Sequence, residues 1–252
     1  MMKDSWVWPY PRRVAHRGGG SLAPENTLAA MRVGYAHGYR MVEFDVKLSG
    51  DGTLMLMHDD TVDRTTDGSG RVAGMTWSEL SQLDAGHGGR DTLPQFIGEP
   101  VPRLESVARY CLANRMAINI EIKPCPGREN ETGAAVAVEV RRLWRGTDQP
   151  PLISSFSEAT LEAAREFAPE LPRALLQDKL TPDWRERLAR LDCVALDADY
   201  KELTPEIVQA AHADGYRVAC YTPNDPVTAQ ELTEWGVDCL ITDAIDRIDP
   251  NG

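Results

Sequence analysis

Short apolar runs alternate with longer amphipathic segments along most of this chain. The short runs are rich in β-branched and other apolar residues, which predicts strands, and most of the segments between them have the spacing and end signals of helices. The predicted strands span 13–18, 39–48, 53–59, 117–124, 151–156, 173–177, 193–199, 217–224 and 239–244. The predicted helices span 25–37, 103–114, 158–168, 182–190, 205–214 and 226–235.

The order of these elements predicts a (β/α)8 TIM barrel. Strands that alternate with helices form a parallel sheet with crossover helices. One of the nine predicted strands is exceptional, because only Gly50, Asp51 and Gly52 separate 39–48 from 53–59. A connection this short makes a hairpin rather than a crossover, so eight parallel strands remain. We expect a single barrel domain over residues 1–252.

The register of this hairpin depends on its turn. If Asp51 and Gly52 form a two-residue turn, Asp45 lies opposite His58 on the same face of the hairpin. A three-residue connection would shift the register by one residue and remove this pairing. The first alternative would bring an imidazole beside a carboxylate.

Residues 60–105 break the regular alternation. They are polar and rich in turn residues, as in "TTDGSG" and "AGHGGR", and they show no strand–helix period. We expect a small insertion over the carboxyl-terminal rim of the barrel, whereas the alternative is a long disordered loop. The apolar residues that favour a small core in the insertion are Trp77, Leu80, Leu83, Phe96 and Ile97.

Composition narrows the class of protein. The 252 residues and 42% hydrophobic content suit one barrel, and the net charge of −12 argues against nucleic acid or an anionic membrane as a partner. The chain has neither a membrane-spanning apolar stretch nor a signal-like start, so we expect a cytoplasmic protein without stable membrane association. Its five cysteines lack metal-binding spacing, which predicts reduced, mostly buried thiols.

Acidic residues cluster near the carboxyl ends of two predicted strands. Glu43 and Asp45 are two residues apart and share a face of one strand, as do Glu121 and Lys123 on another. In a barrel this end holds the active site, and three carboxylates that meet there need a divalent cation to offset their repulsion. The residues that alternate with them are apolar and are expected to face the outer helices: Val42, Phe44, Val46, Ile120 and Ile122.

Two histidines are predicted at the same rim. His16 ends the first strand, and His58 ends the hairpin. Imidazoles that flank a metal site are suited to general acid and base catalysis near neutral pH. Arg17 is suited to binding phosphate oxygens. We expect the glycines that follow it to make room and the helix start near Glu25 to favour an anion.

Four motifs together resemble those of one enzyme family. "HRG" with "PENT", then "EFDV", "HDD" and "EIKP", are similar in order and spacing to the glycerophosphodiester phosphodiesterase family, and "SSFS", "YTPN" and "ITDA" extend the likeness to about residues 13–248. The resemblance implies hydrolysis of glycerophosphocholine or glycerophosphoethanolamine to sn-glycerol 3-phosphate and the alcohol. An alternative is a related metal-dependent phosphodiesterase that acts on lysophospholipids or phosphoinositides.

The resemblance also implies roles for individual residues. A divalent metal, Mg²⁺ or Ca²⁺, would bind Glu43, Asp45 and Glu121. The catalytic acid and base would be His16 and His58, and the phosphate-binding cations would be Arg17 and Lys123. Tyr221 stands beside the glycerol where the family usually has Trp, and Ala244 and Ile245 follow Asp243 where it often has x-Pro.

Overall fold

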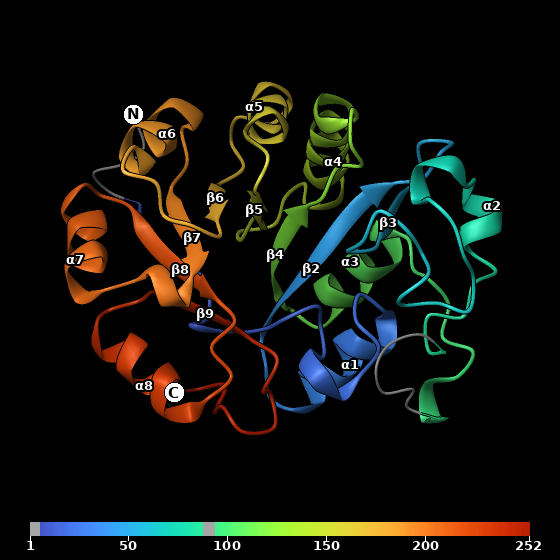
Figure 1. Cartoon of the computed structure of the whole chain (residues 1–252), viewed down its shortest axis with the longest axis horizontal. Coiled ribbons are helices and arrows are strands. Elements are labelled where there is room, and N and C mark those ends of the chain that lie inside the picture. The colour runs from blue at the N-terminus through green and yellow to red at the C-terminus, as the bar shows by residue number, and fades with distance from the viewer. Residues whose placement is uncertain (1–5, 88–93) are drawn as a thin grey trace.

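The computed structural model describes residues 6–87 and 94–252, and it confirms the (β/α)8 TIM barrel (Figure 1). The sheet order is β1-β9-β8-β7-β6-β5-β4-β2-β3, and β1 also pairs with β2, which closes eight parallel strands into a barrel. The parallel strands are β1 (Arg13–Ala15), β2 (Met41–Leu48), β4 (Ala117–Ile122), β5 (Leu152–Ser155), β6 (Arg173–Gln177), β7 (Ala195–Asp199), β8 (Arg217–Tyr221) and β9 (Cys239–Thr242).

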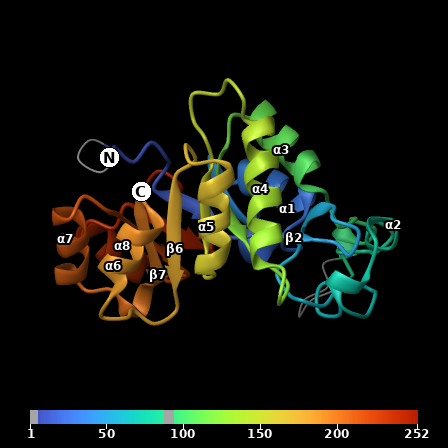
Figure 2. The same cartoon turned by 90° about the horizontal axis from the view of Figure 1, so that it is seen from above.

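Helices surround the barrel on its outside (Figures 1 and 2). Six of them were predicted within a few residues, and their bounds are α1 (Leu28–Ala36), α3 (Leu104–Ala113), α5 (Glu158–Phe167), α6 (Trp184–Leu191), α7 (Pro205–Ala213) and α8 (Pro226–Glu234). A further helix, α4 (Glu129–Leu143), was not predicted from the sequence, although acidic residues lie in its first turn and Arg141 and Arg142 in its last, as suits the helix dipole.

The predicted strands are correct but several are too long at their carboxyl ends. β1 stops at Ala15, before His16, and β8 stops at Tyr221, before the rest of "YTPN". The helix expected from residue 25 begins at Leu28, because Thr27 is its N-cap and Asn26 has a positive φ of 60°. His16, Asn26 and the residues directly after Tyr221 therefore lie in loops rather than in the predicted strands and helix.

The hairpin has the three-residue connection. β3 (Leu54–Leu56) runs antiparallel to β2, and Leu48 pairs with Leu54 across Gly50, Asp51 and Gly52. The register in which Asp45 opposes His58 is therefore wrong, and the Met57 N–H instead donates to the Asp45 carbonyl at 3.2 Å. His58 still reaches the barrel mouth, because the strand ends at Leu56 and alternation no longer fixes which way its side chain points.

Alternation along the strands separates two apolar cores. The outward-facing residues of β2 and β4 pack against the surrounding helices, as expected, and they include Val42, Phe44, Val46, Ile120 and Ile122. Inward-facing residues near the strand starts form a second cluster with Tyr10, against which Trp6 and Trp8 also pack. The amino-terminal segment thus closes the bottom of the barrel and leaves the cavity at the opposite end.

The segment after β3 packs around a third apolar cluster, which includes Val62, Val72 and Leu80, and it contains the short helix α2 (Trp77–Leu80). Trp77 and Leu83 pack against this cluster, but Ile97 is 58% exposed and does not belong to it. Figures 1 and 2 show the segment at one side of the barrel, and Figure 1 shows that it lies next to β3. Residues 88–93 of the expected insertion lie outside the described residues.

Two further findings concern the cysteines and membranes. All five cysteines are buried and none forms a disulfide with another described residue, as the sequence predicted. None of the helices in the described parts of the chain combines the length and apolar character that crossing a bilayer requires.

Helices α4 and α5 lie side by side, and a glycine sets how closely they approach (Figures 1 and 2). A Cβ added at Gly133 of α4 would lie 2.4 Å from the backbone oxygen of Thr160 in α5. The Thr160 hydroxyl also donates to the Glu129 carbonyl at 3.3 Å. A side chain at position 133 would therefore force the two helices apart.

We expect Gly133→Ala to lower the free energy of unfolding by about 1–3 kcal/mol through overpacking, although alanine favours an unconstrained helix by about 1 kcal/mol. Urea unfolding followed by circular dichroism measures the change. Gly74→Ala is the matched control, because a Cβ there meets nothing within 4 Å. Equal stability of the two variants would contradict the close packing inferred at Gly133.

Candidate active site

A cavity of about 420 Å³ opens at the carboxyl-terminal end of the barrel. It brings together residues from all eight parallel strands or from the positions directly after them. Its lining comprises His16, Arg17, Glu43, His58, Asn119, Glu121, Lys123, Phe156, Leu176, Asp178, Asp197, Tyr221, Thr222 and Ile241. Seven of the eight residues to which the sequence assigned roles line this cavity, and the eighth, Asp45, lies beside Glu43 and Glu121.

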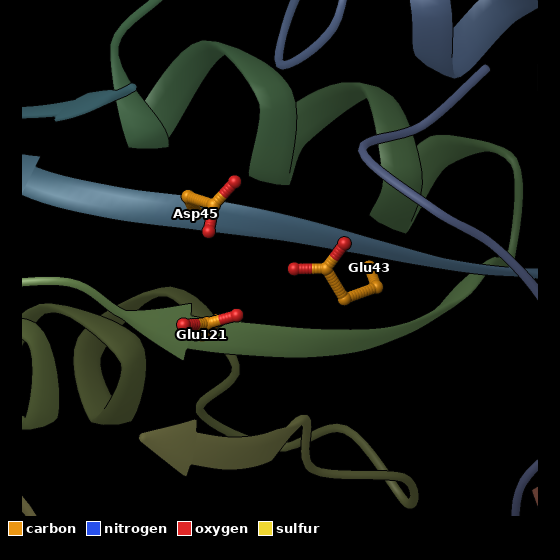
Figure 3. Close-up of side chains that lie close together, drawn as sticks. All are labelled: Glu43, Asp45 and Glu121. Carbon is orange, nitrogen blue, oxygen red and sulfur yellow. The ribbon is translucent and has the colours of Figure 1, made fainter. Parts of the chain in front are cut away.

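Three carboxylates from two strands converge at this cavity. Glu43 and Asp45 project from β2 toward Glu121 of β4, as Figure 3 shows, and one oxygen of each lies within 4.8 Å of the others. Among the described residues this is the one cluster of three or more potential metal ligands. Parallel pairing places Asp45 directly beside Glu121, so the sheet register itself produces the convergence.

The surrounding hydrogen bonds hold the carboxylates but leave ligand positions open. Asn26 donates to Asp45 Oδ2 at 2.8 Å, and the Arg17 backbone N–H donates to Glu43 Oε2 at 2.9 Å. No described residue hydrogen-bonds to the other oxygens, Glu43 Oε1 and Asp45 Oδ1, which are both buried. Buried carboxylate oxygens without donors fit a hard divalent cation, whose preferred ligand is oxygen.

The electrostatics of the cluster also favour a cation. Burial and the neighbouring Asp45 raise the pKa of Glu43 well above its usual range, and the same two causes raise the pKa of Glu121 to about 7. Burial also acts to raise the pKa of Asp45, but the charges of Arg17 and His58 outweigh it and the pKa lies below its ordinary value. Without a cation the three carboxylates therefore resist being charged together.

His58 is held between a carboxylate and an ammonium group. Its Nδ1 lies 2.7 Å from Asp59 Oδ1, and its Nε2 lies 2.8 Å from Lys123 Nζ. Because an ammonium group only donates, Nε2 accepts from Lys123 and the ring proton on Nδ1 is donated to Asp59. Burial lowers the pKa of His58, and this effect prevails although Asp45 opposes it.

His16 has a similar arrangement next to Glu43. Its Nδ1 lies 2.6 Å from Asp243 Oδ1, and its Nε2 lies 3.8 Å from Glu43 Oε2. Asn224 in turn donates to Asp243 Oδ2 at 3.1 Å. Each histidine therefore has a carboxylate behind Nδ1, while its Nε2 faces a residue of the cavity lining.

The expected anion site at the start of α1 is wrong. The first turn of this helix is already occupied, because the Ala29 N–H donates to Glu99 Oε1 at 2.9 Å and the Ala30 N–H donates to Thr27 Oγ1. The glycines after Arg17 make room for the chain itself. A Cβ on Gly20, for example, would lie 2.2 Å from the Asp243 carbonyl oxygen.

Arg64, from the segment after β3, hydrogen-bonds to two carboxylates of the site, Glu25 and Asp59. Its guanidinium donates to both oxygens of Glu25, at 2.7 and 2.8 Å, and to both oxygens of Asp59, at 2.7 and 3.0 Å. Glu25 in turn accepts from Arg17 at 2.7 Å, and Asp59 holds His58. Arg64 thus holds both Glu25, which binds Arg17, and Asp59, which binds His58.

Aromatic side chains form the wall near β5 and β8. Phe156 and Tyr221 pack edge to face with ring centroids 5.9 Å apart, and Lys123 Nζ lies 5.2 Å from the Phe156 centroid. The Tyr221 hydroxyl donates to Asp178 Oδ1 at 3.0 Å. This wall combines apolar surface with a polar edge, which suits a small carbon chain that carries hydroxyl groups.

Sequence reasoning missed several residues of the site. Asn26, Asp59 and Asp243 stand inside "PENT", "HDD" and "ITDA", so their proximity to the predicted residues was a usable signal. Arg64 and Asp197 had no such signal, because their contacts or their burial depend on elements that are distant in the chain.

The fold and the site define a barrel enzyme. Its mouth combines an acidic cluster, two histidines that each hydrogen-bond to an aspartate, and the basic side chains of Arg17 and Lys123. The sequence pattern of the Glycerophosphoryl diester phosphodiesterase family matches residues 16–247. The chain belongs to this family, and it is an enzyme of the glycerophosphodiester phosphodiesterase class.

Individual relatives agree with this assignment. A glycerophosphodiester phosphodiesterase of Caldanaerobacter subterraneus is 33% identical over 91% of this chain and 93% of its own length. A phosphodiesterase of Oleispira antarctica, solved in complex with the product sn-glycerol-3-phosphate, is 38% identical with a TM-score of 0.88 over 95% of each chain. A putative glycerophosphoryl diester phosphodiesterase from Silicibacter pomeroyi is 28% identical with a TM-score of 0.83 over 95% of this chain and 92% of its own.

We expect Arg64→Gln to lower kcat/KM about ten- to a hundredfold, since small displacements of positioned groups cost rate factors of this order. The substitution releases Glu25 and Asp59 together, while the melting temperature changes little because Arg64 is partly exposed. Steady-state kinetics on a glycerophosphodiester measures the loss. Arg109→Gln, which removes only an exposed pair with Glu105, is the matched control, and wild-type kinetics in Arg64→Gln would contradict the connecting role.

Proposed function

We propose that this enzyme catalyses metal-dependent hydrolysis of glycerophosphodiesters, such as glycerophosphocholine or glycerophosphoethanolamine, to sn-glycerol 3-phosphate and the alcohol. The observation that carries the proposal is that His16 and His58 line the same cavity as Glu43 and Glu121 of the acidic triad. The product bound by the Oleispira antarctica relative supports the same substrate class.

Glu43, Asp45 and Glu121 would hold the cation, and the all-carboxylate donor set fits Mg²⁺ or Ca²⁺. When bound, a divalent cation offers positive charge to a phosphate oxygen and lowers the pKa of a hydroxyl that attacks phosphorus. Asn26 and the Arg17 backbone N–H keep the ligands in place by hydrogen bonds to Asp45 and Glu43.

The two histidines would move the protons of the reaction. One takes a proton from the attacking hydroxyl, which is either the substrate 2-hydroxyl or water, and the other gives a proton to the leaving alcohol. Asp59 and Asp243 fix each ring by accepting from Nδ1. Nε2 of His16 then faces the substrate, and Nε2 of His58 meets it once Lys123 exchanges its bond to this nitrogen for a phosphate oxygen. The neutral tautomer of His58, with its lone pair on Nε2, suits the base.

Arg17 and Lys123 would bind the phosphate oxygens. In the structure Lys123 Nζ lies between His58 Nε2 and Glu121 Oε1, at 2.8 and 3.0 Å, which places its charge beside both the base and a metal ligand. Charge-assisted contacts of this kind stabilise the negative charge that develops on the phosphoryl group.

We expect glycerol 3-phosphate release from glycerophosphocholine to stop in EDTA and to return when Mg²⁺ or Ca²⁺ is added in excess. Glu43→Gln replaces one ligand and should weaken activation by the metal, while the metal-free protein melts no lower because the amide needs neither a proton nor a cation to avoid the repulsion. The melting temperature with and without metal checks ligation independently of activity, since an ion that binds the folded state raises it. Full activity in EDTA would exclude the metal from the reaction.

We expect His16→Ala and His58→Ala each to lose about 10²–10⁴-fold in kcat, the range that general acid–base catalysis contributes. Both variants should fold, because the imidazoles hydrogen-bond only at the barrel mouth. His37→Ala serves as control, since His37 lies at the end of α1 and, among the described residues, its ring bonds to the Val33 carbonyl alone. Turnover near the wild-type rate in either site variant would remove that histidine from the mechanism.

A further inference from the structure

One buried acidic residue of the cavity has no place in the mechanism above. Asp197 lies in β7 and lines the cavity, yet none of its surface is exposed. Neither of its side-chain oxygens hydrogen-bonds to any residue in the described part of the chain. A buried carboxyl group without partners opposes folding, so its presence needs an explanation other than stability.

The strand alternation points Asp197 into the barrel. Its neighbours Leu196 and Ala198 belong to the core under the outer helices, whereas Ala195 belongs to the cluster inside the barrel. Asp197 therefore faces the barrel interior with Ala195, one layer closer to the mouth.

Its strand is opposite β2, which carries Glu43 and Asp45 of the acidic triad. Along the closed sheet, four steps lead from β2 to β7 in either direction, through β4, β5 and β6 or through β1, β9 and β8. The phosphate-binding and metal-binding residues come from β1, β2 and β4 or the residues after them. A substrate whose phosphate lies against these strands would extend its other atoms across the cavity toward Asp197.

The other acidic residues around the cavity all have partners. Asp59 binds Arg64, Asp243 binds His16, and Asp178 accepts from Tyr221. Asp197 differs from all of them, because its partners in the sheet are Leu176 of β6 and Ala219 of β8, whose side chains offer no hydrogen bond. The partner that would satisfy it must therefore come with the ligand.

We propose that Asp197 forms a hydroxyl-binding subsite that accepts the terminal hydroxyl of the substrate's glycerol. The inference rests on the proposed function and adds a specificity-determining residue to it. The terminal hydroxyl is the glycerol group farthest from phosphorus, so it would reach the wall opposite β2, while Phe156 and Tyr221 would cover the carbon chain.

A hydroxyl is the group that this carboxyl suits best. Burial raises the pKa of Asp197 well above its usual range, with a smaller contribution from Glu121, and a protonated carboxyl both donates and accepts. A hydroxyl does the same, whereas an ammonium head group would require the charged form. A second metal ion is disfavoured, since Asp197 belongs to no group of three potential ligands among the described residues.

The test compares two substrates that differ in one hydroxyl. Glycerophosphocholine carries the terminal hydroxyl, and 2-hydroxypropyl phosphocholine lacks it but keeps the 2-hydroxyl. We expect wild-type enzyme to prefer the first about tenfold or more in kcat/KM, because an unpaired buried polar group makes such sites reject the analogue. No preference in the wild type would overturn the subsite.

Variants of Asp197 then assign the preference to this residue. In Asp197→Ala the preference should fall to near one through loss on glycerophosphocholine alone, and the melting temperature should not fall. Asp197→Asn should keep most of the preference, because an amide also donates and accepts. Asp199→Asn is the matched control on the same strand, where Asp199 Oδ1 accepts from the Lys201 N–H. An unchanged preference in Asp197→Ala, or equal losses on both substrates, would refute the assignment.

Two further outcomes are separable. If the loss in Asp197→Asn appears with glycerophosphocholine but not with glycerophosphoglycerol, whose head group is uncharged, Asp197 binds the ammonium group and the proposed subsite is wrong. If the wild-type enzyme releases no glycerol 3-phosphate from any glycerophosphodiester, the proposed function itself fails. An active wild-type enzyme without the hydroxyl preference overturns the subsite alone.

Discussion

Like-charge repulsion among Glu43, Asp45 and Glu121 is the constraint on which the rest of the site depends. Parallel pairing of β2 with β4 places Asp45 beside Glu121, and the two-residue period adds Glu43 to the same face. The fold stabilises this arrangement only in part, with donors on one oxygen each of Glu43 and Asp45. The remaining instability is what makes a cation favourable there.

A second group of residues fixes the orientation of the side chains at the barrel mouth. Asp59 and Asp243 orient the two imidazoles, and Arg64 joins Asp59 to Glu25. Arg64 belongs to the segment after β3, which packs around its own apolar cluster. This segment therefore contributes directly to the site, because it supplies Arg64, which joins Asp59 to Glu25.

Buried polar groups in this barrel fall into two kinds. Lys47, although almost fully buried, is satisfied by Asp60 at 2.8 Å and by the Lys123 carbonyl at 3.1 Å, and it serves the structure. Glu43 Oε1, Asp45 Oδ1 and both oxygens of Asp197 have no such partners within the described residues. Because the interior penalises unsatisfied polar atoms, these oxygens are the ones that the proposed metal and substrate would satisfy.

The sequence alone determined the strands, the barrel and most of the site, because residue periodicity and short motifs are local properties. Glu43, Asp45, Glu121 and Lys123 were predictable since a strand's period of two fixes which side chains share a face. The tertiary structure decided what depends on distant elements. It selected the three-residue hairpin connection, and it placed the Glu99 carboxylate where it accepts from the Ala29 N–H at the start of α1. It also placed Arg64 between two carboxylates and left Asp197 without a partner, because both outcomes depend on which strands and loops meet around a closed barrel.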